Sequence, residues 1–193
     1  MRLFFGVDVT TDIRSELAGV QARLQEHGVH AGNWSSPELF HLTLLFIGET
    51  SEEQAETLRV IGQETASQAS AFTLNLSSLG MFERNRILWY GVQDDSGMEA
   101  LRRVYRRITG LAVNLPFVKI DERPYSPHLT LARKLEHDSI SRVRTAMADE
   151  AISAPVSAHR FPVHSICLFE SKQVNGKLAY PILERYNFPD GGA

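Results

Sequence analysis

The residues best suited to chemistry in this sequence are two histidines that open identical four-residue stretches. His-Leu-Thr-Leu begins at His41 and again at His128. Both copies start short apolar runs that contain a β-branched residue, which predicts β-strands, and side chains alternate between the two faces of a strand. Thr43 therefore shares a face with His41, and Thr130 shares a face with His128, while the leucines between them point into a core. Each copy is expected to present one imidazole and one hydroxyl from a rigid strand.

Two such strands on opposite walls of a cleft would suit reactions at phosphorus. An unperturbed imidazole titrates at about 6.5 and can donate or accept a proton near neutrality, so a pair can act as general acid and general base. Threonine hydroxyls are neutral donors for the non-bridging oxygens of a phosphate, where charge stabilisation contributes much of phosphoryl-transfer catalysis. The pattern predicts a phosphodiester substrate, with His41, His128, Thr43 and Thr130 as the catalytic residues.

The fifth position after each histidine adds a second pair of candidates. Phe46 follows His41 by five residues, and Arg133 follows His128 by the same distance. Strict alternation would put both side chains on the face opposite the histidines, which suits Phe46 as a core residue but not Arg133. A strand end or a β-bulge would bring Arg133 to the substrate, and an aromatic ring and a guanidinium together would sandwich a base. Both are therefore candidate substrate-binding residues.

The remaining segments predict an α+β fold built from a duplicated unit. We expect two largely antiparallel sheets with helices outside and the two histidine strands facing each other across a central cleft. Residues 1–193 are expected to form a single domain of two pseudo-symmetric lobes, with the turn-rich segment 31–37 at one rim of the cleft. Apolar spacing and end signals predict helices over 12–27, 52–69, 96–112 and 138–149, strands over 2–9, 72–76, 86–92, 156–161, 163–171 and 177–184, and an ordered proline-rich loop over 114–127.

Composition narrows the compartment and the partner. Apolar residues make up 43% and charged residues 22% of the 193 residues, as in ordinary soluble proteins. The single cysteine, Cys167, excludes an intrachain disulfide and predicts a buried thiol in a reducing cytoplasm. No apolar run approaches the roughly 20 residues of a membrane helix, and the start has too short an apolar run for a signal peptide. We expect a cytoplasmic protein with no membrane association.

The formal net charge of −3 argues against a protein that coats nucleic acid, so an RNA substrate would meet only local basic patches. One helix face could attract phosphates from a distance, although a solvated surface would have the same pattern. Its residues are Arg102, Arg103, Arg106 and Arg107. Some loop residues could also contact RNA, although an ordinary surface role is the favoured interpretation; they are Arg84, Arg86, Lys119, Arg123 and Tyr125.

The residues around the two histidines resemble the 2H phosphoesterase superfamily. Within it, the closest likeness is to the RNA 2′,3′-cyclic phosphodiesterases, also called 2′-5′ RNA ligases. The likeness rests on the paired His-Leu-Thr-Leu, the Leu-Phe-Ile-Gly-Glu after the first copy, the Pro before the second, and the opening Arg-Leu-Phe-Phe-Gly-Val-Asp. It covers nearly the whole chain. It implies a bilobal α+β fold and hydrolysis of RNA 2′,3′-cyclic phosphate ends to 2′-phosphates, with neither a metal nor another cofactor.

By position, the resemblance implies that His41 donates a proton to the departing 3′ oxygen and that His128 activates water. Thr43 and Thr130 would hold the phosphate oxygens. In the reverse direction a 5′-hydroxyl replaces water and a 2′-5′ linkage forms without ATP, because the cyclic phosphate is already strained. The partner would be RNA with a 2′,3′-cyclic phosphate end, such as a tRNA fragment, and the chain would act as a monomer.

Other functions fit the same residues. One is a 2H-type phosphodiesterase acting on small cyclic nucleotides or on 3′-terminal nucleotides, and another is a non-catalytic binder of RNA ends or nucleotides. A metal site is a third, although catalytic zinc normally takes three protein ligands and the second polar position of each copy is threonine. The other histidines have no patterned partner and are expected to be structural or on the surface; they are His27, His30, His137, His159 and His164.

Overall fold

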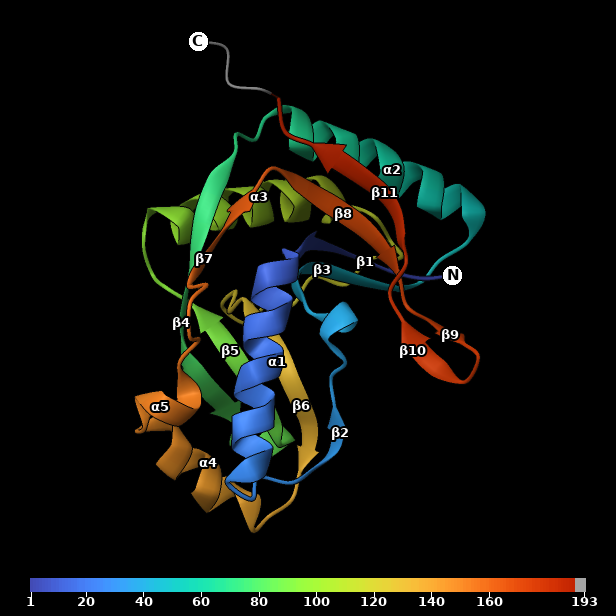
Figure 1. Ribbon diagram of the computed structural model, residues 1–193. Helices are drawn as coiled ribbons and strands as arrows, with labels where there is room; N and C mark the ends of the chain where they lie inside the picture. The colour runs from blue at the N-terminus through green and yellow to red at the C-terminus, as the bar shows by residue number, and fades with distance from the viewer. Residues whose placement is uncertain (190–193) are drawn as a thin grey trace.

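A computed structural model describes residues 1–189, and Figure 1 labels its helices and strands. The strands are β1 (Arg2–Asp8), β2 (Ala31–Trp34), β3 (His41–Glu49), β4 (Phe72–Phe82), β5 (Ile87–Val92), β6 (His128–Leu135), β7 (Arg160–Val163), β8 (Ser165–Glu170), β9 (Lys172–Val174), β10 (Lys177–Ala179) and β11 (Ile182–Asn187). The helices are α1 (Thr11–Glu26), α2 (Glu52–Ser67), α3 (Ser96–Ala112), α4 (Ser139–Met147) and α5 (Glu150–Ser153), with short 3₁₀ turns η1 (Pro37–Leu39) and η2 (Glu83–Asn85).

Two antiparallel sheets form the framework, which confirms the expected α+β class. The first has the strand order β11-β8-β1-β3 and the second has the order β2-β6-β5-β4-β7, with β9 and β10 forming a separate hairpin. The two sheets do not correspond to the two halves of the sequence, because each takes strands from both. The histidine strands β3 and β6 belong to different sheets and contact each other between them.

Helices cover the sheets and bury the leucines of the histidine strands. Helices α2 and α3 pack together, with α2 against β8 and β11, whereas α1 crosses the face of the second sheet (Figure 1). Gln21 of α1 donates hydrogen bonds of 2.8 Å to the carbonyl oxygens of Ser35 and Leu131, which attaches the helix to the middle of β6 and to the residue after β2. Leu42, Leu129 and Leu131 are completely buried, as alternation predicted.

Local capping explains where the first two helices begin and end. The Thr10 side chain accepts a hydrogen bond from the backbone N–H of Ile13 at the start of α1, and Gly28 follows the helix at φ +75°, a conformation that costs glycine little. At α2, Ser51 and Gln54 form the reciprocal pair of hydrogen bonds of a capping box. These helix starts were predictable because each cap lies within one turn of sequence.

Several expected boundaries were wrong where pairing decides the structure. Residues 31–34, expected to be part of a turn-rich rim, form strand β2 because they pair with β6. The strand expected over 177–184 is interrupted, and residues 172–179 form the β9–β10 hairpin around Asn175 and Gly176, both at positive φ. The helix predicted over 138–149 corresponds to α4, and the short helix α5 follows it outside the predicted range. None of these short segments has enough periodicity to predict its pairing.

Candidate active site

The two candidate catalytic histidines are held in the same way. His41 Nδ1 lies 2.7 Å from the Leu39 carbonyl oxygen, and His128 Nδ1 lies 2.9 Å from the Ser126 carbonyl oxygen. A carbonyl can only accept, so in both rings the proton is on Nδ1 and, when the ring is neutral, Nε2 is the acceptor nitrogen. The Thr43 hydroxyl lies 3.1 Å from His41 Nε2. The Thr43 hydroxyl therefore lies on the same face of the strand as His41 Nε2, as the sequence predicted.

A β-bulge in β3 brings Phe46 to the face of His41, so the prediction of strict alternation was wrong for this residue. His41 pairs with Asp8 and Thr43 with Gly6, but Phe46 pairs with Phe4, and the register shifts between Phe5 and Gly6. Residues directly opposite in an antiparallel pair share a face. The partners Asp8, Gly6 and Phe4 are alternate residues of β1 and share one face of that strand. His41, Thr43 and Phe46 therefore also share one face. Phe46 is 47% exposed and is not a core residue.

An equivalent bulge in β6 does the same for Arg133. His128 pairs with Gly91, Thr130 with Trp89 and Arg133 with Ile87, with a register shift between Leu88 and Trp89. The extra residue lies at the same point of the repeat as in β3. Arg133 therefore shares the face of His128 and Thr130. Both walls of the site carry an imidazole, a hydroxyl and a third side chain at the fifth position.

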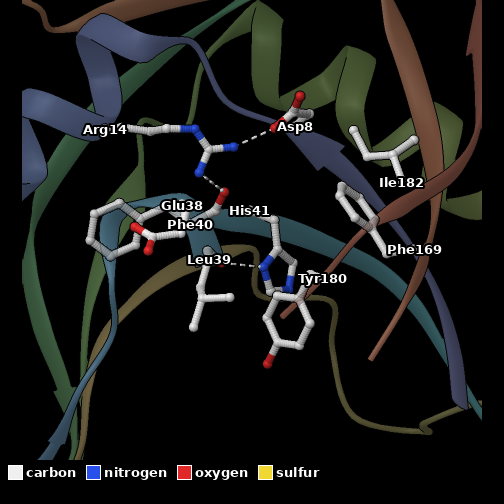
Figure 2. A pocket seen from close by; sticks show the side chains of 9 residues that line it. All are labelled: Asp8, Arg14, Glu38, Leu39, Phe40, His41, Phe169, Tyr180 and Ile182. Atoms are coloured by element: carbon white, nitrogen blue, oxygen red, sulfur yellow. Dashed lines mark hydrogen bonds and ion pairs between the residues drawn. The ribbon is translucent and has the colours of Figure 1, made fainter. Parts of the chain in front are cut away.

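Aromatic rings surround both imidazoles. The His41 ring centroid lies 4.8 Å from that of Phe4, 5.9 Å from Phe169 and 5.1 Å from Tyr180, whose edge-on ring is drawn beside His41 in Figure 2. His128 has Phe82 at 5.1 Å and Trp89 at 6.2 Å. Sequence reasoning missed all five rings. No repeat or spacing signals them, because they come from four other strands and from the segment after β10.

Burial keeps His41 neutral at ordinary pH. The pKa of His41 is lowered from 6.5 to about 4, mainly by loss of hydration and also by the positive charges of Arg133, His128 and Arg14, while the hydrogen bond to the Leu39 carbonyl opposes this shift. The pKa of His128 is also lowered, first by burial and then by the charge of Arg133. One arginine thus acts on both rings, which means that Arg133 lies near both histidines.

The loop before His128 is bonded directly to the opposite wall. The Tyr125 hydroxyl donates a 3.1 Å hydrogen bond to the backbone carbonyl oxygen of Thr43. Its ring stacks on Tyr105 of α3 with the centroids 4.0 Å apart and the planes at 6°. Tyr125 is three residues from His128, so this contact ties the separation of the two walls to a rigid helix.

A scan against protein-family models matches the 2′-5′ RNA ligase superfamily over residues 9–175. The chain belongs to this superfamily.

Several members of the superfamily are similar over most of the chain. An RNA 2′,3′-cyclic phosphodiesterase of Escherichia coli is 27% identical over 188 residues, which are 96% of this chain and 95% of that protein. One from Geobacillus stearothermophilus is 29% identical over 162 residues, or 82% of this chain, but this match spans only about half (49%) of that relative. The crystal structure of E. coli LigT complexed with 3′-AMP has a TM-score of 0.78 at 25% identity and covers 97% of each chain.

Three of the loop residues that were candidates for RNA contact have partners within the protein. Arg86 donates to the Leu135 carbonyl oxygen, Arg123 pairs with Asp121, and the partly buried Tyr125 bonds to Thr43. Contact of these loops with RNA stays a prediction. On α3, Arg102 pairs with Asp94 and Glu99, and Arg107 pairs with Glu64; Arg103 and Arg106 are exposed. Attraction of RNA by this helix stays a prediction.

Two further expectations concern metals and membranes. Within residues 1–189, no group of three or more His, Cys, Asp or Glu side chains is arranged to hold a metal ion. His41 and His128 thus lack the third protein ligand that catalytic zinc normally has. No helix in the same range is long and apolar enough to cross a membrane.

Cys167 is buried, and burial raises the pKa of its thiol to about 11.

Proposed function

We propose that this protein hydrolyses the 2′,3′-cyclic phosphate at the end of an RNA chain to a 2′-phosphate. The observation that carries the proposal is the arrangement of the two walls. Each offers an imidazole whose Nδ1 is bonded to a backbone carbonyl, which leaves Nε2 for proton transfer, and a hydroxyl on the same face; the charge of Arg133 acts on both rings. Relatives similar over 82% and 96% of this chain are named RNA 2′,3′-cyclic phosphodiesterases.

The two histidines supply opposite proton transfers. His128 Nε2 takes a proton from a water molecule, and the water oxygen forms a bond to phosphorus. The bond from phosphorus to the 3′ oxygen breaks, and this oxygen takes the proton that His41 Nε2 carries. The products are a 3′-hydroxyl and a 2′-phosphate. General acid and base catalysis of this kind is worth roughly 10²–10⁴ in rate for each residue.

The other four positions hold the substrate. The Thr43 and Thr130 hydroxyls donate to the non-bridging oxygens, and the Arg133 guanidinium offsets the charge that they carry in the transition state. Phe46 is exposed on the same face and offers its ring to the base of the terminal nucleotide, with Arg133 as the opposite side of a sandwich.

His41 must be protonated to act as the acid, and in the free protein its pKa is about 4. A bound phosphate is negative and lies beside Arg133, so it reverses the charge effect that disfavours the imidazolium. Substrate binding is thus expected to raise the pKa of His41. His41 is therefore expected to become protonated when the phosphate is bound.

The same geometry supports ligation, in which a different nucleophile attacks the cyclic phosphate. If a 5′-hydroxyl of a second RNA replaces water, His128 removes its proton and the product is a 2′-5′ phosphodiester. The energy comes from opening the strained cyclic phosphate, so ATP is not needed. We further propose that the protein works as a monomer in the cytoplasm, on RNA such as tRNA fragments, which agrees with its single buried cysteine.

The test is product analysis with a defined RNA end. An oligonucleotide that ends in a 2′,3′-cyclic phosphate is incubated with the protein in the presence of a chelator, and the end group is identified. We expect a 2′-phosphate, with a loss of about 10²-fold or more in His41→Ala and His128→Ala. His137→Ala, an exposed histidine without a partner in the pattern, is the matched control. A 3′-phosphate product, or activity that the chelator abolishes, would contradict the proposal.

A further inference from the structure

A pocket of about 260 Å³ opens beside His41, on the side of the ring where β3 begins (Figure 2). It is slightly smaller than the roughly 300 Å³ at which pockets for drug-sized ligands begin, so it accommodates one ring-bearing unit. None of the catalytic steps above uses it. The residues that matter for its chemistry are Asp8, Arg14, Glu38, His41, Tyr180 and Ile182.

Arg14 makes this pocket preformed. Its guanidinium donates to the Pro37 carbonyl oxygen at 2.6 Å. It also donates to the Phe40 carbonyl oxygen at 3.0 Å and to the Asp8 carboxylate at 2.5 Å, as Figure 2 shows. These bonds hold the η1 turn against β1, and the same turn supplies the carbonyl that orients His41. The wall of the pocket and the orientation of the imidazole therefore depend on one set of contacts.

The lining favours a neutral group with a flat apolar face and hydrogen-bond donors. Tyr180 and the exposed Ile182 form an apolar side. Asp8 pairs with both Arg14 and Arg185, and Glu38 is exposed and has no ion-pair partner within residues 1–189. The formal charges of Asp8, Glu38, Arg14 and Arg185 sum to zero, so these side chains favour a neutral group, and the Glu38 carboxylate can accept a hydrogen bond from a hydroxyl or a ring N–H. A nucleoside has all of these features.

The position of the pocket beside His41 indicates which nucleoside of the RNA it would bind. In the proposed reaction His41 serves the 3′ oxygen of the terminal ribose, and from C3′ the sugar continues through C4′ and C5′ to the preceding nucleotide. A subsite for this nucleotide must also be open at its far end. A second hollow of about 520 Å³ shares Arg14 and Glu38 with the pocket and runs on along α1 past Thr11 and Ser15. The RNA chain can leave in this direction.

We propose that the His41 pocket binds the penultimate nucleoside of the substrate and so selects RNA ends over cyclic mononucleotides. This inference rests on the proposed function and specifies its substrate. The terminal base would lie toward Phe46, the cyclic phosphate between the histidines, and the preceding nucleoside against Tyr180 and Ile182.

Two substrates with the same reacting end test the inference. The kcat/KM for adenosine 2′,3′-cyclic phosphate is compared with that for the dinucleotide ApA carrying the same cyclic end. We expect the dinucleotide to be preferred by at least about tenfold, which corresponds to about 1.4 kcal/mol of added binding in the transition state. Hydrolysis of the mononucleotide with no preference for the dinucleotide would overturn the subsite and leave the proposed function intact. Failure to hydrolyse either would overturn both.

Variants of the pocket residues test whether the preference for the dinucleotide depends on the pocket. Ile182→Trp fills it, and is expected to remove most of the dinucleotide preference while hydrolysis of the mononucleotide stays within about twofold. Val156→Trp adds the same ring at a position that is 79% exposed and outside the pocket, and should leave both rates unchanged. Glu38→Gln, which keeps the shape of the side chain, is expected to weaken the preference in part. A preference that survives Ile182→Trp and Glu38→Gln in folded protein would overturn the assignment.

Discussion

The depressed pKa of His41 makes a quantitative prediction about stability in acid. In the unfolded chain the imidazole has a pKa of 6.5, and in the folded protein burial lowers this pKa to about 4. Below pH 6.5 the unfolded state therefore binds a proton that the folded state does not, so stability falls as the pH falls from 6.5 towards 4. Each unit of difference is worth about 1.4 kcal/mol, so this residue alone costs about 1 kcal/mol at pH 5.5 and about 2.5 kcal/mol at pH 4.5, relative to pH 7.

His41→Asn isolates this contribution. Asparagine does not titrate, and its side-chain N–H can replace Nδ1 as the donor to the Leu39 carbonyl. Urea unfolding at pH 7, 5.5 and 4.5 gives the free energy of unfolding of both proteins. We expect the wild type to lose about 2.5 kcal/mol more than the variant by pH 4.5, because all other titrating groups are common to the two. His137→Asn, at an exposed position, should behave as the wild type. Equal losses in wild type and His41→Asn would refute the burial argument.

Three further predictions concern the contacts around the site. Arg133→Gln should raise the pKa of both His41 and His128, since one positive charge opposes both protonations, and an NMR titration of the imidazole protons would show no change if Arg133 lay elsewhere. Tyr125→Phe should lower the free energy of unfolding by about 1–2 kcal/mol in urea by leaving the Thr43 carbonyl without its donor, whereas Tyr105→Phe, which keeps the stacked ring, should not. Thr43→Val should lower kcat by roughly 10²-fold and Thr43→Ser should restore most of it; equal activity in the two variants would exclude the hydroxyl from the transition state.

The charge state of the site has a consequence for substrate binding. With His41 neutral, Arg133 is the main fixed cation among the groups that act on the two imidazoles. A phosphate that enters next to Arg133 makes protonation of His41 easier, and a protonated His41 in turn binds the phosphate more tightly. Binding of the 2′-phosphate product is therefore expected to take up a proton near neutral pH, which calorimetry in buffers of different ionisation enthalpy would measure.

Much of the site was predictable from the sequence because its information is local. The two His-Leu-Thr-Leu stretches predicted strands, and alternation alone placed each threonine on the face of its histidine and buried the leucines between them. The first two helices begin at Thr10 and Ser51 for reasons that are complete within one turn of chain. Residues a few positions apart determine these features, and no distant contact has to form first.

Only the tertiary structure decided what the fifth position of each repeat does. Phe46 and Arg133 reach the site because β3 and β6 each carry an extra residue relative to the neighbouring strand, and a bulge exists only in relation to a partner. The rings of Phe4, Tyr180 and Trp89 lower the hydration of the histidines from segments that no spacing connects to them. The sequence by itself determined which groups can carry protons and on which face of each strand they lie. Packing of distant strands determined their charge, their distance from one another and the shape of the space beside them.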